Sequence, residues 1–190
     1  TAALRARLSR PRLGVLLFLV VAVSAWSEVV HAQPNPAEVQ NLNQQLSDPE
    51  QAGAEIPRVR QLLAVATDSA YVGLLRQMLL KGLVASGASS KQIADAADTT
   101  LPYVALTTRT PAVFYGSLAR LLASRQEELP RALGYARAGV RSLPDDDSRT
   151  PGMRGFAYGS VGVVHFEAGR LDSGPTWLMA SLPVSPVSQE

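Results

Sequence analysis

The chain has 190 residues, 46% of them hydrophobic and 6% aromatic, a composition typical of a helical protein with a core of Leu, Val and Ala. It has no cysteine, which excludes a disulfide framework, a thiolate nucleophile, a cysteine-bound metal and a lipoprotein anchor. The formal net charge is +2, but 14 basic residues face 15 acidic ones beyond residue 32, so charge gives no argument for nucleic-acid binding.

The first 32 residues have the pattern of a secretory signal peptide. Four arginines precede an apolar run that is shorter than the roughly 20 residues needed to span a bilayer, and Glu28 interrupts any extension. We expect cleavage after Ala32, with Ala25 as a weaker site and an uncleaved anchor as the alternative. The prediction is export to the bacterial periplasm or beyond, with no membrane association after cleavage. The basic residues are Arg5, Arg7, Arg10 and Arg12, and the apolar run covers 13–23.

Residues 33–56 are polar, rich in Gln, Asn and Pro, and lack a sustained apolar period, which predicts a flexible leader. A helical repeat domain is expected over 57–186. Its first helix should be short, following Pro57 and ending near Thr67.

Two further helices are predicted to form an early repeat. Asp68 or Ser69 can cap a long helix that Gly87 ends, and Ser89 or Ser90 can cap the next one. The register of this pair against later helices stays open.

Proline at the first helical position starts two later helices, after Thr110 and after Thr150. Each should be followed by a short turn and an antiparallel partner. The expected helices cover 112–124, 130–142, 151–167 and 171–182.

The second half of the chain repeats one arrangement of residue types: an aromatic, an aliphatic and small pair, a bulky residue, a small residue and a closing proline. This pattern resembles the tetratricopeptide repeat (TPR), best over 111–144 and 151–186. The resemblance implies an all-α fold of helix-turn-helix repeats, stacked as a short right-handed α-solenoid. The matched series are Tyr115, Leu118, Ala119, Leu122, Ala132, Pro144 and Tyr158, Val161, Gly162, His165, Gly174, Pro186.

The closing prolines lie 42 residues apart, longer than the roughly 34 of a plain repeat, because an acidic linker is inserted after Pro144. Small residues should mark where paired helices cross closely. They are Ala119 with Ala132, and Gly162 with Gly174.

No residue pattern indicates catalysis or a cofactor. His165 has no second ligand or nucleophile beside it, and its place in the repeat explains it as a core residue. The acidic run 145–147 lacks the spacing of a calcium loop and is better explained as a solvated turn. The glycines near residue 159 do not have phosphate-loop spacing. We therefore predict no enzyme activity, no cofactor and no metal.

The resemblance implies a peptide groove on the first helix of each repeat. Its charged member is Arg120, and it lacks the Lys and Asn of a carboxylate clamp, which leaves a shallow apolar groove. The alternative is that Phe156 and Phe166 only pack on a neighbouring repeat. The positions are Val113, Gly116, Arg120, Ala123, Phe156, Gly159, Val163 and Phe166.

The function implied is a scaffold that binds a peptide or partner protein. Alternatives are an accessory module of a larger exported enzyme and self-association. The chain begins with Thr1 and has no polar capping helix, so we interpret it as a fragment, with 187–190 the start of a further segment; a degenerate final repeat is the alternative.

Overall fold

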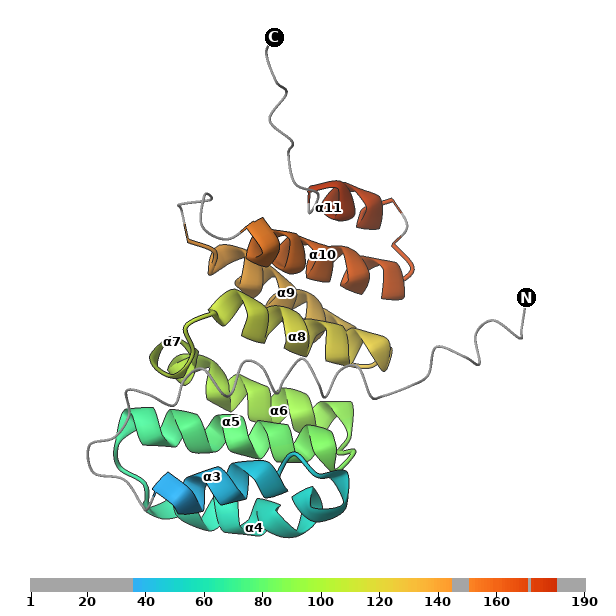
Figure 1. The fold of residues 1–190 in the computed structure, drawn as a ribbon. Coiled ribbons are helices and arrows are strands. Elements are labelled where there is room, and N and C mark those ends of the chain that lie inside the picture. The colour runs from blue at the N-terminus through green and yellow to red at the C-terminus, as the bar shows by residue number, and fades with distance from the viewer. Residues whose placement is uncertain (1–35, 145–150, 171, 181–190) are drawn as a thin grey trace. The chain divides into compact units, whose positions relative to one another are not determined.

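The described part of the protein is all-helical, as predicted. The computed structural model describes residues 36–144, 151–170 and 172–180, and no strand occurs among them. The chain divides into two units, Thr1–Arg109 and Thr110–Glu190, so the repeat domain expected over 57–186 is shared between them (Figure 1). The predicted signal peptide, the linker 145–150 and the segment 187–190 lie outside the described residues.

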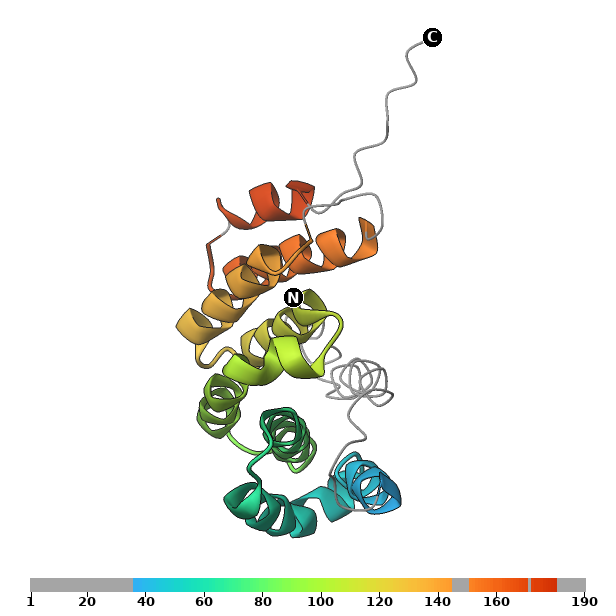
Figure 2. The same ribbon diagram turned by 90° about the vertical axis from the view of Figure 1, so that its left-hand side faces the viewer.

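Unit 1 is a set of antiparallel helices in which α5 packs against α4 on one side and against α6, η1 and α7 on the other (Figure 1, Figure 2). Its core is aliphatic and small, with Leu75, Leu80, Ile93 and Val104 fully buried. The elements are α3 (Pro36–Gln45), α4 (Pro49–Val65), α5 (Ser69–Ala85), α6 (Ser90–Thr100), the 3-10 turn η1 (Leu101–Tyr103) and α7 (Val104–Thr107).

The prediction of a flexible leader is wrong for residues 36–56, which form α3 and the first half of α4. Asp48 caps α4 by accepting a hydrogen bond from the Glu50 backbone N–H, and Pro49 takes the first helical position. Leu46 is fully buried, so the few apolar residues of this polar stretch find partners in the fold. The helix therefore begins before Pro57, which lies inside it.

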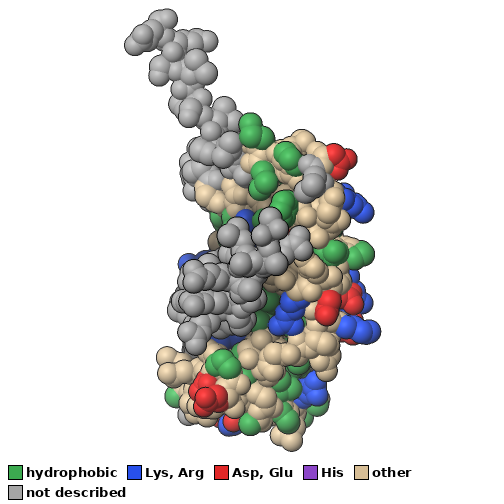
Figure 3. Space-filling view, turned by 90° about the vertical axis from the view of Figure 1, so that its right-hand side faces the viewer, with side chains coloured by type: hydrophobic (Ala, Val, Ile, Leu, Met, Phe, Trp, Pro, Cys, Tyr) green, Lys and Arg blue, Asp and Glu red, His purple; other side chains and the backbone are tan. Residues whose placement is uncertain are grey.

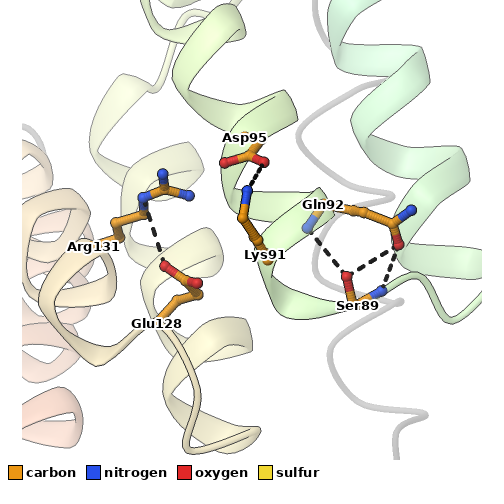
Figure 4. A network of polar contacts seen from close by, with 6 residues as sticks. All are labelled: Ser89, Lys91, Gln92, Asp95, Glu128 and Arg131. Atoms are coloured by element: carbon orange, nitrogen blue, oxygen red, sulfur yellow. Dashed lines mark hydrogen bonds and ion pairs between the residues drawn. The ribbon is translucent and has the colours of Figure 1, made fainter.

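The caps predicted for the next pair of helices are confirmed. Asp68 Oδ1 accepts a hydrogen bond from the Tyr71 N–H at 2.8 Å, and Gly87 has a φ of +72° just after α5. Ser89 and Gln92 form a reciprocal capping box at the start of α6 (Figure 4).

Unit 2 consists of two antiparallel helix pairs, in which α10 packs against α8, α9 and α11. A left-handed residue, Glu128 with φ of +52°, precedes α9 and pairs with Arg131 on its first turn (Figure 4). The predicted starts of α8 and α10 are confirmed, and the predicted bounds of α9 are close to those observed. The helices are α8 (Pro111–Ser124), α9 (Leu129–Arg141), α10 (Pro151–Glu167) and α11 (Gly174–Ala180).

Helix α11 begins later than the 171–182 expected, and residues 181 and 182 lie outside the described ranges. It begins at Gly174, which places Pro175 in the first turn, where its missing N–H breaks no helical hydrogen bond. A Cβ on Gly162 of α10 would lie 3.3 Å from the Gly174 carbonyl oxygen, and a Cβ on Gly174 would lie 3.5 Å from the Gly162 carbonyl oxygen. The predicted close crossing at these two glycines is confirmed.

The helices α8 and α9 also approach closely at a glycine that the repeat pattern does not contain. Ala119 and Ala132 are fully buried, as expected. A Cβ on Gly139, however, would lie 3.2 Å from the Ala112 carbonyl oxygen and 3.4 Å from the Tyr115 Cβ. The backbone of α8 therefore limits the side chain at position 139.

Candidate interaction surface on α8 and α10

The first helices of the two predicted repeats lie side by side and run in the same direction. Gly116 of α8 receives the Phe156 ring of α10, whose Cε1 would lie 2.6 Å from a Cβ at that glycine. Further along both helices, Gln126 Nε2 donates a hydrogen bond to Glu167 Oε2 at 3.3 Å. Because the contacts advance together along both helices, α8 and α10 present one continuous surface.

Arg120 is held in a fixed position on this surface. Its Nε donates a hydrogen bond to Ser160 Oγ at 2.9 Å, and its guanidinium carbon lies 4.5 Å from the centre of the Phe156 ring. A cation stacked on an aromatic face and bonded at Nε has little freedom to rotate. Burial lowers the pKa of Arg120 below its ordinary value, although a guanidinium stays protonated at neutral pH.

Arg120 has no carboxylate partner in the part of the chain that the structure describes. Arginines that do form ion pairs elsewhere in the described residues include Arg58, which pairs with Glu38, and Arg131, which pairs with Glu128. A cation that is partly removed from water without a counter-charge loses hydration. The site therefore has the electrostatic character of an anion-binding position.

The other predicted groove residues differ in accessibility. Gly116, Ala123 and Gly159 are buried, and Ala123 is fully so, which leaves it no surface to offer a partner. Val113 and Val163 are half-buried. The observed surface is therefore narrower than the groove that the sequence predicts.

Phe156 and Phe166 behave differently from one another. Phe156 is half-buried and packs on Gly116 and Arg120, as the alternative explanation of its role expected. Phe166 is 61% exposed, near the end of α10. In the upper part of Figure 3, apolar side chains lie at the surface of the α10–α11 region.

Sequence reasoning missed Ser160. Its hydroxyl donates to the Phe156 carbonyl oxygen at 2.7 Å and accepts from Arg120, so it links two turns of α10 to α8. A serine four residues after an aromatic has no distinctive sequence signal, and its partner Arg120 is 40 residues away.

His165 lies in the core, as predicted, with 5% of its surface exposed. Burial, Arg170 and Arg137 lower the pKa of its imidazole, and Asp172 opposes them. Its Nδ1 has no hydrogen-bond partner among the described residues. The neutral imidazole is therefore the favoured form in this environment.

Unit 1 contains a buried cation that sequence reasoning also missed. The Lys81 Nζ donates to the backbone oxygen of Asn43 at 2.9 Å and to its Oδ1 at 2.8 Å, which ties α5 to α3. Burial lowers the pKa of Lys81 to about 8.

Within the described ranges, no group of three His, Asp or Glu side chains is placed to hold a metal ion. None of the helices in those ranges is both long and apolar enough to cross a bilayer. Comparison of the chain with protein-family models, with curated proteins and with solved structures finds no match. The resemblance to TPR proteins therefore stays a prediction from the residues.

Proposed function

We propose that this chain is a protein-interaction scaffold with TPR-like repeats, and that the surface of α8 and α10 receives a segment of a partner protein. The observation that carries the proposal is the 61% exposure of Phe166 on the helix whose Phe156 holds Arg120. A large exposed apolar side chain on a helix that also holds a stacked arginine suits a binding surface, since exposed apolar patches mark interaction sites and arginine is enriched among energetically dominant contacts.

The helix arrangement of unit 2 supports TPR-like stacking. The parallel first helices α8 and α10 lie side by side, and α10 also contacts α9, the second helix of the preceding pair. In each pair a glycine allows a close antiparallel crossing, at Gly139 and at Gly162. The contacts of α10 with α8 and α9 are of the kind that a stack of helix pairs requires between neighbouring repeats.

A site-specific photo-crosslinker tests the interaction surface. We would place benzoyl-phenylalanine at position 166 in the producing cells and, as the control, at position 134, a glycine exposed on α9. The expected result is a covalent adduct to one partner protein from position 166 and not from position 134. Phe166→Ala should then weaken binding of that purified partner in calorimetry.

Each outcome of the crosslinking has a defined meaning. Equal adducts from both positions, or none from position 166, would contradict a specific surface at Phe166. An adduct between two copies of the chain would replace the scaffold proposal with self-association.

The proposal places the protein outside the cytoplasm, on the basis of the signal-peptide pattern in residues 1–32. Mass spectrometry of the protein from the exported fraction should find Gln33 as its first residue. An intact chain recovered only from the cytoplasm would contradict this part of the proposal.

A further inference from the structure

Unit 1 contains a side-chain arrangement similar to that of the α8–α10 surface, although its hydroxyl is bonded by a glutamine and not by the arginine. Gly73 of α5 is buried, and a Cβ there would lie 2.7 Å from the Tyr103 Cβ and 2.6 Å from the Thr107 Cγ2. The Arg76 guanidinium carbon lies 5.4 Å from the centre of the Tyr103 ring. Thr107 Oγ1 donates to the Tyr103 carbonyl oxygen at 2.8 Å and is in turn bonded by Gln77 Nε2 at 2.5 Å.

The correspondence with unit 2 extends over four positions. In each unit a helix carries a glycine and, three or four residues later, an arginine. The facing segment carries an aromatic ring and, four residues later, a hydroxyl that bonds back to the carbonyl of the aromatic residue. The series are Gly73, Arg76, Tyr103 and Thr107 in unit 1, and Gly116, Arg120, Phe156 and Ser160 in unit 2.

This correspondence favours one of the repeat registers that the sequence left open, the one that aligns the two tyrosines and the two arginines. Tyr71 and Tyr115 both lie five residues before the stacked arginine, so α5 corresponds to α8. In this register, the segment η1–α7 of unit 1 corresponds to the first turns of α10 in unit 2.

Both arginines lack a counter-charge among the described residues. Arg76 is half-buried, and its Nε is a buried donor without a hydrogen-bond partner there. The Nε of Arg120 is bonded to a neutral hydroxyl, while its two terminal amino groups make no hydrogen bond to another described residue. Charge-assisted, two-point bonds to a carboxylate are the strongest that such a pair of amino groups can form.

We propose that Arg120 in unit 2 and Arg76 in unit 1 are two separate subsites, and that each holds a carboxylate side chain of an acidic, partly apolar segment of a partner protein. The inference rests on the proposed function and names the chemistry of the partner. Charge complementarity carries it, because an aromatic ring fixes each cation and a carboxylate is the group that its two free amino groups match. In unit 2 the exposed Phe166 lies on the same helix as the stacked ring and suits apolar residues of that segment.

An array of immobilised ten-residue peptides tests the inference with the purified full chain. Each peptide alternates leucine and serine, and one serine is replaced by Asp, Glu, Gln, Lys or phosphoserine. A charge-assisted hydrogen bond contributes about 1.5–3 kcal/mol, so Asp or Glu peptides should be retained at least about tenfold better than the Gln peptides.

Charge-reversed variants assign the preference to a residue. Arg120→Glu should transfer the preference in unit 2 from acidic to Lys peptides, and Arg76→Glu should do the same for any binding through unit 1. Arg141→Glu makes the same change of charge at an exposed position of α9 and should leave the preference unchanged. If Arg120→Glu lowers the helical signal in circular dichroism, Arg120→Gln replaces it and should abolish the preference without reversing it.

The possible results separate the inference from the proposed function. Peptides that bind with no preference for Asp or Glu, or a preference that survives both arginine variants, would overturn the carboxylate subsites and leave the scaffold standing. Retention of phosphoserine peptides alone would overturn them in favour of a phosphate site. Crosslinking to a partner at position 166 with no peptide retained would also refute the inference, whereas failure of the crosslinking itself refutes the proposed function.

Discussion

Two glycines on the same helix should respond in opposite ways to alanine. Gly134 and Gly139 both lie in α9, but a Cβ at position 134 would meet nothing within 4 Å, whereas one at position 139 would lie 3.2 Å from the Ala112 carbonyl oxygen. In an exposed helix interior, alanine is more stable than glycine by about 0.5–1 kcal/mol. Gly134→Ala should therefore stabilise unit 2 by about that amount.

Gly139→Ala gains the same helical preference but must push α8 away. The atoms it meets belong to the α8 backbone or to the Tyr115 Cβ, at 3.4 Å, and cannot rotate aside as a flexible side chain would. Overpacking of this kind costs about 1–3 kcal/mol, which leaves a net loss of about 0–2.5 kcal/mol after the helical preference of alanine is subtracted.

Thermal unfolding followed by far-UV circular dichroism measures the difference. For a unit of this size about 1 kcal/mol corresponds to a Tm change of about 4–8 °C. The Tm of Gly134→Ala should therefore lie above that of the natural protein, and the Tm of Gly139→Ala should lie at or below it. Equal increases in Tm for both variants would refute the close approach of α8 and α9.

Three further predictions concern single side chains. The stability of unit 1 should rise with pH from about 8 toward 10.5, because the unfolded chain keeps a proton that the folded Lys81 releases; Lys81→Met should flatten this dependence in urea titrations. For unit 2, stability should fall as the pH drops below 6.5, since the pKa of His165 is lowered in the folded state, and an unchanged acid dependence in His165→Phe would contradict this. Ser89→Ala should cost about 1 kcal/mol by removing the capping box of α6, measured by the denaturation midpoint with Ser86→Ala as the control.

Helix starts could be predicted from the sequence where one residue type determines them. Asp68 and Ser89 are capping residues whose side chains bond the nearby backbone, and Pro111 is restricted to the φ of a first helical turn. These effects act over a few residues, so a local pattern contains them.

Helix α3 could not be predicted in the same way. Val39 and Leu42 in α3 and Leu46 just after it are buried and spaced three and four apart, but the glutamines and asparagines between them hide the period. Their burial depends on contacts with other helices rather than on local helix preference. The sequence pattern of a polar helix that is stabilised by packing therefore resembles that of a flexible leader.

The same distinction applies to the candidate site. Arg120 could be picked out as the charged member of the predicted surface, but its orientation depends on Phe156 and Ser160, which follow on a later helix. The linker 145–150 lies in the sequence between Arg120 and these two residues. No fixed sequence interval therefore predicts their contact.

Because Lys81 is hydrogen-bonded to Asn43, acylation of its amine can report on the contact between α5 and α3. Lys81 and Lys91 are the lysines of the chain, one buried in the tie between α3 and α5 and the other exposed on α6. The tie buries the Lys81 amine, so an acylating reagent reaches it only when α3 has moved away from α5. Acylation of Lys81 relative to Lys91 thus measures how often α3 detaches, with the second lysine correcting for reagent and time.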